Sequence, residues 1–142
     1  MSQPNESQNP ADQAKRKNVL LIDDAPNVLL VFEEFLTVNG CTVKTAANGT
    51  DALNQLKQMD FDAICCDLMM PDMTGETFYN SVQQVKPQLC SRFVLVTGYV
   101  GHSRLEEFIK REKIVALYKP VSADALIGAL NQVLNGPTAE NG

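Results

Sequence analysis

The chain has 142 residues, of which 44% are hydrophobic and 20% are charged, and its formal net charge is −5 at pH 7. This length suits one domain with a single hydrophobic core. The acidic balance argues against a broad electrostatic contact with nucleic acid. Apolar runs such as NVLLI are too short to span a bilayer, and the polar first residues contain no signal core. We therefore expect a cytoplasmic protein without membrane insertion.

Both ends of the chain are polar. Residues 1–16 are rich in Ser, Gln, Asn and Pro, and we expect a disordered N-terminal tail. Residues 136–142 have the same character and are expected to form a flexible C-terminal tail, which leaves one domain over residues 17–135. The four cysteines lack the spacing of a metal site. We expect all of them to be reduced, with Cys65 and Cys66 on opposite faces of a strand.

Short apolar runs alternate with amphipathic segments throughout this domain. The runs are predicted strands, at residues 18–22, 41–46, 61–66, 92–97 and 114–118. Apolar residues at helical spacing predict the helices, at residues 26–40, 49–59, 74–85, 103–113 and 122–135. Pro26 suits a first helical turn, Gly40 a helix end and Ser122 an N-cap. Five strands alternating with five helices predict an α/β fold, with a parallel sheet that carries helices on both faces.

Polar side chains mark the carboxyl ends of four of the five predicted strands. They are Asp23 and Asp24, Asp67, Thr97, and Lys119. The second strand ends on alanines, so acids are not a general feature of the strand ends in this chain. Ligands bind at the carboxyl ends of the strands in open sheets of this kind, so we expect these side chains to meet.

Three carboxylates in one place repel each other. At about 4 Å and an effective dielectric of about 20, each close pair costs roughly 4 kcal/mol, so a cation or a proton should join them. Oxygen ligands of this kind suit Mg²⁺, which accepts one or two carboxylates together with phosphate oxygens. A lysine and a threonine nearby suit a phosphoryl group, and a carboxylate can itself be the nucleophile that forms an aspartyl phosphate.

Four stretches follow their predicted strands in a fixed order: LLIDDAP, CCDLMMPDMTG, VLVTGY and LYKPVS. With this ordered set the chain resembles the receiver domain of two-component response regulators over residues 17–135. The resemblance implies a flavodoxin-like, doubly wound (βα)5 fold with strand order 2-1-3-4-5. It implies that Asp67 is the phosphoacceptor. It also implies that Mg²⁺ is bound by Asp23, Asp24, Asp67 and the backbone carbonyl of Met69.

The resemblance assigns roles to the residues around this centre as well. Thr97 and Lys119 would bind phosphoryl oxygens, and Gly98 would leave room for the incoming group. Pro71 and Gly75 would shape the loop after the phosphoacceptor. The peptide bond between Lys119 and Pro120 is expected to be cis.

The implied function is a signalling switch rather than an enzyme, with only self-catalysed phosphotransfer and dephosphorylation. The donor would be a histidine kinase or a histidine phosphotransfer protein, and the downstream target is a protein that the sequence does not name. Only a few polar residues follow residue 135, and we expect no output domain. We therefore expect signalling through surface contacts, made by the last two helices and the last strand.

Two features depart from the family pattern. Ala116 stands three residues before the lysine, where the family often has Tyr or Phe; Tyr118 lies next to the lysine instead. Met69 and Tyr99 are bulky at positions that flank the phosphoryl group in the family. We hypothesise that these two side chains hinder the attacking water and prolong the aspartyl phosphate.

Three other functions are compared with the receiver. An aspartyl phosphatase should carry a second acid two residues after its nucleophile, whereas Asp67 is followed by LMM. A flavin-binding protein of this fold should have a loop rich in Ser, Thr or Gly after the first strand, whereas this chain has DDAPN. A degenerate receiver, which acts as a protein interaction module without phosphorylation, remains open. His102, the only histidine, is interpreted as a surface residue.

Overall fold

The computed structural model describes residues 16–98, 101 and 103–141. Its sheet has five strands in the order β2-β1-β3-β4-β5, and every neighbouring pair is parallel. The strands are β1 (Lys17–Ile22), β2 (Cys41–Ala46), β3 (Ala63–Asp67), β4 (Phe93–Thr97) and β5 (Val115–Tyr118). The predicted doubly wound sheet and its strand order are confirmed.

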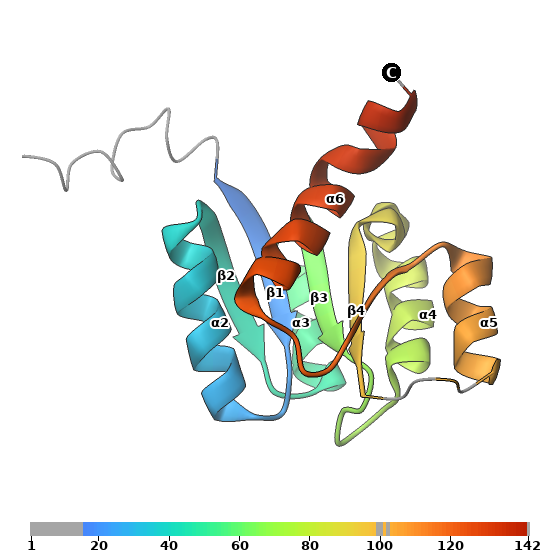
Figure 1. Cartoon of the computed structure of the whole chain (residues 1–142). Helices are drawn as coiled ribbons and strands as arrows, with labels where there is room; N and C mark the ends of the chain where they lie inside the picture. Colours follow the sequence, from blue (N-terminus) through green and yellow to red (C-terminus); the bar gives the residue numbers. More distant parts are fainter. Residues whose placement is uncertain (1–15, 99–100, 102, 142) are drawn as a thin grey trace, which may run out of the picture.

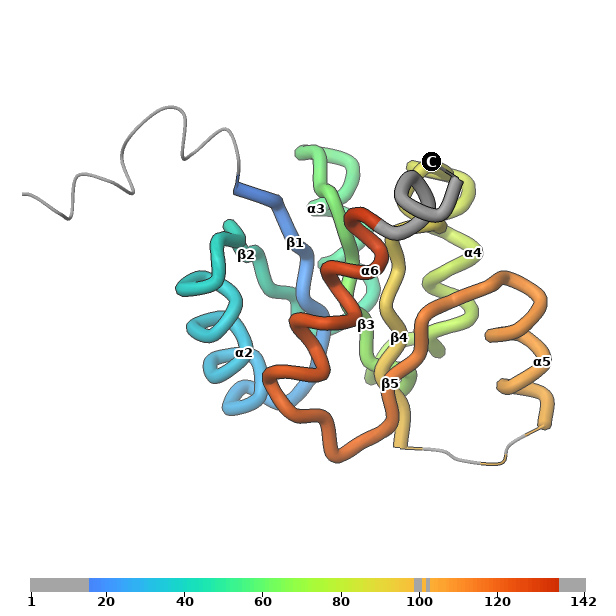
Figure 2. Tube along the Cα trace, turned by 45° about the horizontal axis from the view of Figure 1, so that its top comes forward, coloured from blue at the N-terminus to red at the C-terminus, as the bar shows by residue number. Residues whose placement is uncertain are grey.

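Helices cover both faces of the sheet (Figure 1). They are α2 (Pro26–Val38), α3 (Gly49–Gln58), α4 (Gly75–Val85), α5 (Ser103–Glu112) and α6 (Ala123–Asn141), with the 3-10 helix η2 (Pro87–Arg92). Figure 2 shows the same chain tilted, with β5 beside β4 at one edge of the sheet. No helix in the described part of the chain has the length and apolar character needed to cross a bilayer.

Each face of the sheet has its own hydrophobic core. Leu20, Ile64 and Cys66 pack with residues of α3, α4 and α5, whereas Leu21 and Cys65 pack with residues of α2 and α6. Alternation along a strand explains this division, because successive side chains point to opposite faces. The predicted separation of the two adjacent cysteines is therefore confirmed, and both thiols are buried.

Local signals explain several helix ends. The predicted cap at Ser122 is confirmed, since its hydroxyl accepts a hydrogen bond from the amide of Ala125. Pro26 occupies the first turn of α2. Gly40 follows that helix with φ +96°, a backbone conformation that glycine adopts without steric cost.

The structure differs from the sequence prediction at both ends of the domain. Arg16, assigned to the tail by its composition, donates hydrogen bonds to the carbonyls of Thr37 and Cys41 and holds the end of α2. Helix α6 continues to Asn141, six residues beyond its predicted end. The Gly136–Pro137 pair lowers helix propensity, but the structure extends the helix through it. Residues 1–15 lie outside the described residues.

Candidate functional site

Asp23 and Asp67 meet because β1 and β3 are neighbours. Ile22 pairs with Cys66, so the next residue of each strand emerges at the same edge of the sheet. Together with Asp24 they form a cluster in which one oxygen of each carboxylate lies within 4.8 Å of the others. Asp23 is 7% exposed and Asp67 is 5% exposed, while Asp24 faces solvent. The structure thus brings together the three carboxylates that the sequence singled out.

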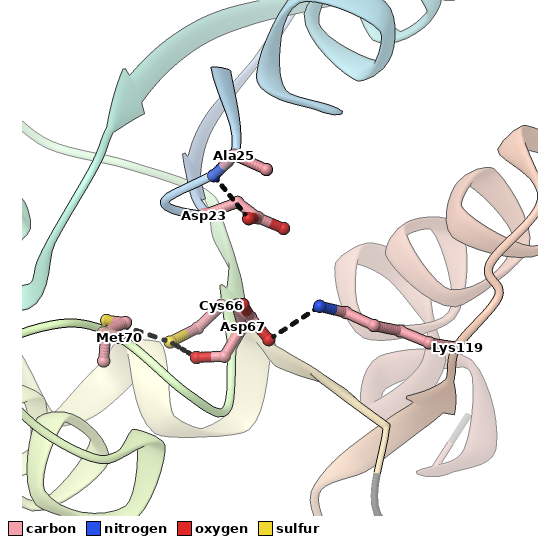
Figure 3. Close-up of polar contacts among 6 residues, drawn as sticks. All are labelled: Asp23, Ala25, Cys66, Asp67, Met70 and Lys119. Carbon is pink, nitrogen blue, oxygen red and sulfur yellow. Dashed lines mark hydrogen bonds and ion pairs between the residues drawn. The ribbon is translucent and has the colours of Figure 1, made fainter. Parts of the chain in front are cut away.

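The carboxylate of Asp23 is fixed by the start of the following helix. Its Oδ1 atom accepts a hydrogen bond of 2.9 Å from the amide of Ala25, and its own amide donates to the carbonyl of Ala46 on β2. Figure 3 shows the side chains of Asp23 and Asp67 directed toward a common space. These bonds restrict the Asp23 side chain to the position that faces Asp67.

Lys119 extends toward Asp67 from the side that faces away from Met70 (Figure 3). Its Nζ atom lies 3.3 Å from Oδ1 of Asp67, and its side chain is 45% exposed, so it reaches inward from solvent. The amide of Lys119 donates to the carbonyl of Thr97, which joins the ends of β4 and β5. The peptide bond from Lys119 to Pro120 is cis, the isomer that the resemblance implies.

The electrostatic environment of the carboxylate cluster favours a bound cation. Burial, and then the nearby Asp23 carboxylate, raise the pKa of Asp67, although Lys119 and a hydrogen bond from the backbone of Met69 act in the opposite direction. Among the described residues, the Lys119 ammonium group faces the three carboxylates. Oxygen donors that are few, anionic and clustered fit a hard divalent cation such as Mg²⁺.

The loop after Asp67 runs beside the cluster. The amide of Leu68 donates to the carbonyl of Val96, and the amide of Gly75 donates back to the carbonyl of Leu68 at 2.7 Å. A Cβ atom on Gly75 would lie 3.0 Å from Leu95 and 3.1 Å from the Cα atom of Leu68, so a larger residue there would require neighbouring atoms to shift. Met69 is 51% exposed at the start of the loop, and Pro71 lies near its tip.

The remaining expected residues lie at the end of β4. Thr97 is fully buried and pairs with Tyr118 across the β4–β5 ladder. Gly98 is exposed, and a Cβ atom there would meet nothing within 4 Å, so the space beside it is open. Tyr99 and His102, both considered from the sequence, lie outside the described residues.

Ala116 and Tyr118 occupy the same face of β5, because they are two residues apart on a strand. Ala116 pairs with Leu95, whose side chain belongs to the core beneath α3, α4 and α5. Tyr118 is 41% exposed at the strand end. Compared with the family pattern, in which the aromatic residue stands at the position of Ala116, the aromatic side chain of β5 thus lies two residues closer to the cluster.

The cluster opens into a cavity of about 630 Å³ that the sequence alone did not reveal. Its polar end includes Asp23, Asp24, Asp67 and Lys119. Its apolar end lies between α2 and α6, where the walls include Val28, Phe32, Val96, Val121 and Leu126. These walls come from elements far apart in the sequence, so no local pattern could have identified them.

The arrangement can support nucleophilic chemistry on phosphorus. A buried carboxylate is available as nucleophile, an ammonium group can pair with a phosphoryl oxygen, and the acidic cluster can hold a cation. Catalysis of phosphoryl transfer consists mostly of positioning and charge stabilisation, and rigid strand ends supply the positions.

Comparison with known proteins gives a consistent result. Residues 19–131 match the response regulator receiver domain. The chain is 28% identical over 118 residues to the chemotaxis protein CheY of Bacillus subtilis (strain 168), covering 82% of this chain and 97% of that protein. It is 29% identical over 120 residues to the transcriptional regulatory protein GlrR of Escherichia coli (strain K12), covering 84% of this chain but only 27% of that protein.

Solved structures agree with the sequence relatives. The chemotaxis response regulator CheY4 of Vibrio cholerae superposes with a TM-score of 0.75 at 29% identity, covering 84% of this chain and 100% of that chain. The family match spans all five strands except the first residues of β1, and it contains every residue of the acidic cluster. The chain therefore belongs to the receiver domains of two-component response regulators.

Proposed function

We propose that this chain is a phosphorylatable receiver in which Asp67 accepts a phosphoryl group from a phosphohistidine. Receiver domains are signalling switches that take their phosphoryl group from histidine kinases. The observation that carries the proposal is the placement of a buried Asp67 carboxylate beside Asp23 and Asp24, with the Lys119 ammonium group 3.3 Å away. In this proposal the receiver domain covers residues 17–135.

The residues of the chain divide the chemistry between them. An oxygen of Asp67 forms a bond to phosphorus while the phosphorus–nitrogen bond of the donor histidine breaks, and the electron pair leaves with the imidazole. Lys119 then pairs with a phosphoryl oxygen, the Thr97 hydroxyl donates to another, and Gly98 leaves space for the group. The ends of β3, β4 and β5 hold these residues in place during the transfer.

Mg²⁺ is the metal that these residues would hold. Its ligands would be Asp23, Asp24 and Asp67, together with the backbone carbonyl of Met69. When bound, the ion supplies positive charge that offsets both the clustered carboxylates and the oxygens of the phosphoryl group.

The signal would be a change in protein contacts. Phosphorylation biases the loops around Thr97 and Lys119 between two arrangements, which is a shift in a pre-existing equilibrium. The surfaces affected first would be those of β5 and the neighbouring helices α5 and α6, because Lys119 continues directly from β5. A downstream protein that prefers one arrangement would then read the phosphorylated state.

The decisive experiment is intact mass spectrometry after incubation with acetyl phosphate, with and without Mg²⁺. We expect one phosphoryl adduct that requires Mg²⁺ and is absent from Asp67→Asn. Asp60→Asn is a matched control, since Asp60 pairs with Lys86 on the surface and should leave labelling intact. A wild-type protein that gains no adduct, while an established receiver is labelled in parallel, would support the phosphorylation-independent interaction module instead.

A further inference from the structure

Asp72 joins the loop after the phosphoacceptor to a helix that precedes it in the sequence. Its Oδ1 atom accepts a hydrogen bond of 2.9 Å from the amide of Gly49. Its Oδ2 atom accepts bonds from the amide of Thr50 at 2.9 Å and from the hydroxyl of Thr50 at 2.6 Å. The tip of the β3–α4 loop is thus bound to the first turn of α3 by three hydrogen bonds.

These bonds add to the cap that the helix has from its own N-cap residue. Asn48 is the N-cap of α3, and its side chain accepts a hydrogen bond of 2.8 Å from the amide of Asp51. Asp72 supplies acceptors for the two preceding amides from a different part of the chain. A carboxylate is also favoured at this end of the helix, where the macrodipole is positive. The hydroxyl and amide bonds of Thr50 and the amide bond of Gly49 together lower the pKa of Asp72 to about 2.

Met73 adds a packing contact to the same junction. A Cβ atom on Gly49 would lie 2.5 Å from the Sδ atom and 2.6 Å from the Cγ atom of Met73. The missing side chain at Gly49 therefore lets Met73 pack directly on the helix backbone. The loop and α3 are therefore held together by the hydrogen bonds of the Asp72 carboxylate and by the packing of the adjacent Met73.

The loop has further contacts: the buried side chain of Met70 packs in the core beside Cys66, and two contacts lie at its base. Met69 forms an antiparallel bridge with Thr74, and Gly75 donates to the carbonyl of Leu68. This narrow base contains the carbonyl group that is expected to bind the metal, and the tip carries Asp72. Fixing the tip on α3 therefore restricts how the Met69 peptide can rotate.

We propose that Asp72 is a positioning residue for the metal site, which holds the Met69 carbonyl in place by fastening the β3–α4 loop to the N-terminus of α3. This inference rests on the proposed function, because it requires Mg²⁺ to bind at the acidic cluster. Asp72 itself does not contact the metal in this proposal. It acts through the loop, so its loss should weaken Mg²⁺ binding without removing the carboxylate ligands.

The test compares Mg²⁺ affinity in wild type, Asp72→Ala and Asn48→Ala, by amide NMR titration with MgCl2 at a temperature where all three proteins are folded. Both substitutions remove a cap from the same helix, but only Asp72→Ala releases the loop. We expect Asp72→Ala to raise the Kd for Mg²⁺ at least fivefold and Asn48→Ala to change it less than twofold. Asp72→Asn, which keeps one acceptor oxygen, should fall between wild type and Asp72→Ala.

Two further readouts separate positioning from general destabilisation. In metal-free protein, the amides of residues 68–75 should shift and exchange faster in Asp72→Ala, but not in Asn48→Ala. With acetyl phosphate, Asp72→Ala should require more Mg²⁺ yet reach the wild-type labelling rate when Mg²⁺ is saturating. Equal Mg²⁺ affinities in wild type and Asp72→Ala would overturn the positioning role alone. A wild-type protein that does not bind Mg²⁺ would overturn both this role and the metal site of the proposed function.

Discussion

The Nζ atom of Lys119 lies 3.3 Å from Oδ1 of Asp67, and this ion pair crosses from the edge of the sheet to its centre. The carboxylate is buried and the ammonium group is half exposed, so the two groups meet where the sheet opens to solvent. Lys119 is the cation that faces the carboxylate cluster in the described structure. Its removal should therefore alter Asp67 more than it alters the fold.

We expect Lys119→Met to raise the pKa of Asp67 further, because Lys119 lowers that pKa by its charge and by a hydrogen bond. The free energy of unfolding at pH 7 should fall, because the buried Asp67 carboxylate then loses the ammonium group that offsets its charge. The NMR chemical shift of the Asp67 side-chain carboxyl carbon, measured as a function of pH, reports this pKa. Lys86→Met breaks the surface pair with Asp60 and should leave the Asp67 titration unchanged. An Asp67 pKa that stays the same in Lys119→Met would contradict the contact.

Asp67→Asn should stabilise the metal-free protein at pH 7. The pKa of Asp67 is raised in the folded state by burial and by Asp23, so ionisation disfavours folding. For such a group the penalty is absent below the unfolded-state pKa, near 3.8, and grows as pH rises through the folded-state pKa. The advantage of the amide should accordingly shrink as pH falls toward 3.8. Thermal unfolding of both proteins across this pH range measures it.

Adding Mg²⁺ should change the relative stability of wild type and Asp67→Asn. The ion binds the folded wild type and stabilises it by mass action, whereas Asp67→Asn offers one carboxylate fewer. We expect the Tm of wild type to rise with MgCl2 by more than that of Asp67→Asn. Magnesium-free buffers with NaCl at matched ionic strength provide the control. Equal increases in both proteins would show that the cluster does not bind the ion through Asp67.

The central part of the site was predictable from the sequence because strand ends fix it. Asp23 and Asp67 end neighbouring parallel strands, so alternation and sheet order alone bring their carboxylates together. Lys119 also follows the carboxyl end of a parallel strand, β5, and its long side chain reaches from the sheet edge past β4 to Asp67. Short strands with apolar character leave few alternative positions for these three side chains.

Other features of the structure depend on tertiary contacts or on short segments that no local sequence pattern encodes. Asp72 reads as a turn residue, and only the folded loop shows that it binds Gly49 and Thr50. The 3-10 helix η2 was not predicted, since six residues are too few for a periodic signal. Arg16 was assigned to a polar tail by composition, but its bonds go to backbone carbonyls more than twenty residues away.

Phe108→Ala should weaken the attachment of α5 to the rest of the domain. Phe108 is 2% exposed and meets Tyr79 of α4 edge to face, with ring centroids 5.3 Å apart. Truncating a buried phenylalanine typically lowers the free energy of unfolding by about 3–5 kcal/mol. Val38→Ala is the matched control, because Val38 is 80% exposed and should cost less than about 0.5 kcal/mol. Denaturant unfolding measures both, and similar losses would argue against the packing described for α5.

Met69→Asn should shorten the lifetime of the aspartyl phosphate. The Met69 side chain is 51% exposed at the start of the loop after Asp67, where it can screen the phosphoryl group from water. Replacing it with a shorter polar side chain admits and orients that water. A tenfold faster hydrolysis would correspond to a barrier lower by about 1.36 kcal/mol. The decay of the phosphoryl adduct, followed by intact mass after donor removal, gives the rate directly.

Leu30→Asn makes the same kind of change on an exposed apolar residue of α2 and should leave the decay unchanged. Tyr99→Ala tests the second bulky side chain of the hypothesis by the same assay. If Met69→Asn and Tyr99→Ala both decay at the wild-type rate, steric protection by these residues is wrong. The lifetime must then depend on the groups that bind the phosphoryl oxygens, which makes Lys119 and Thr97 the next residues to substitute.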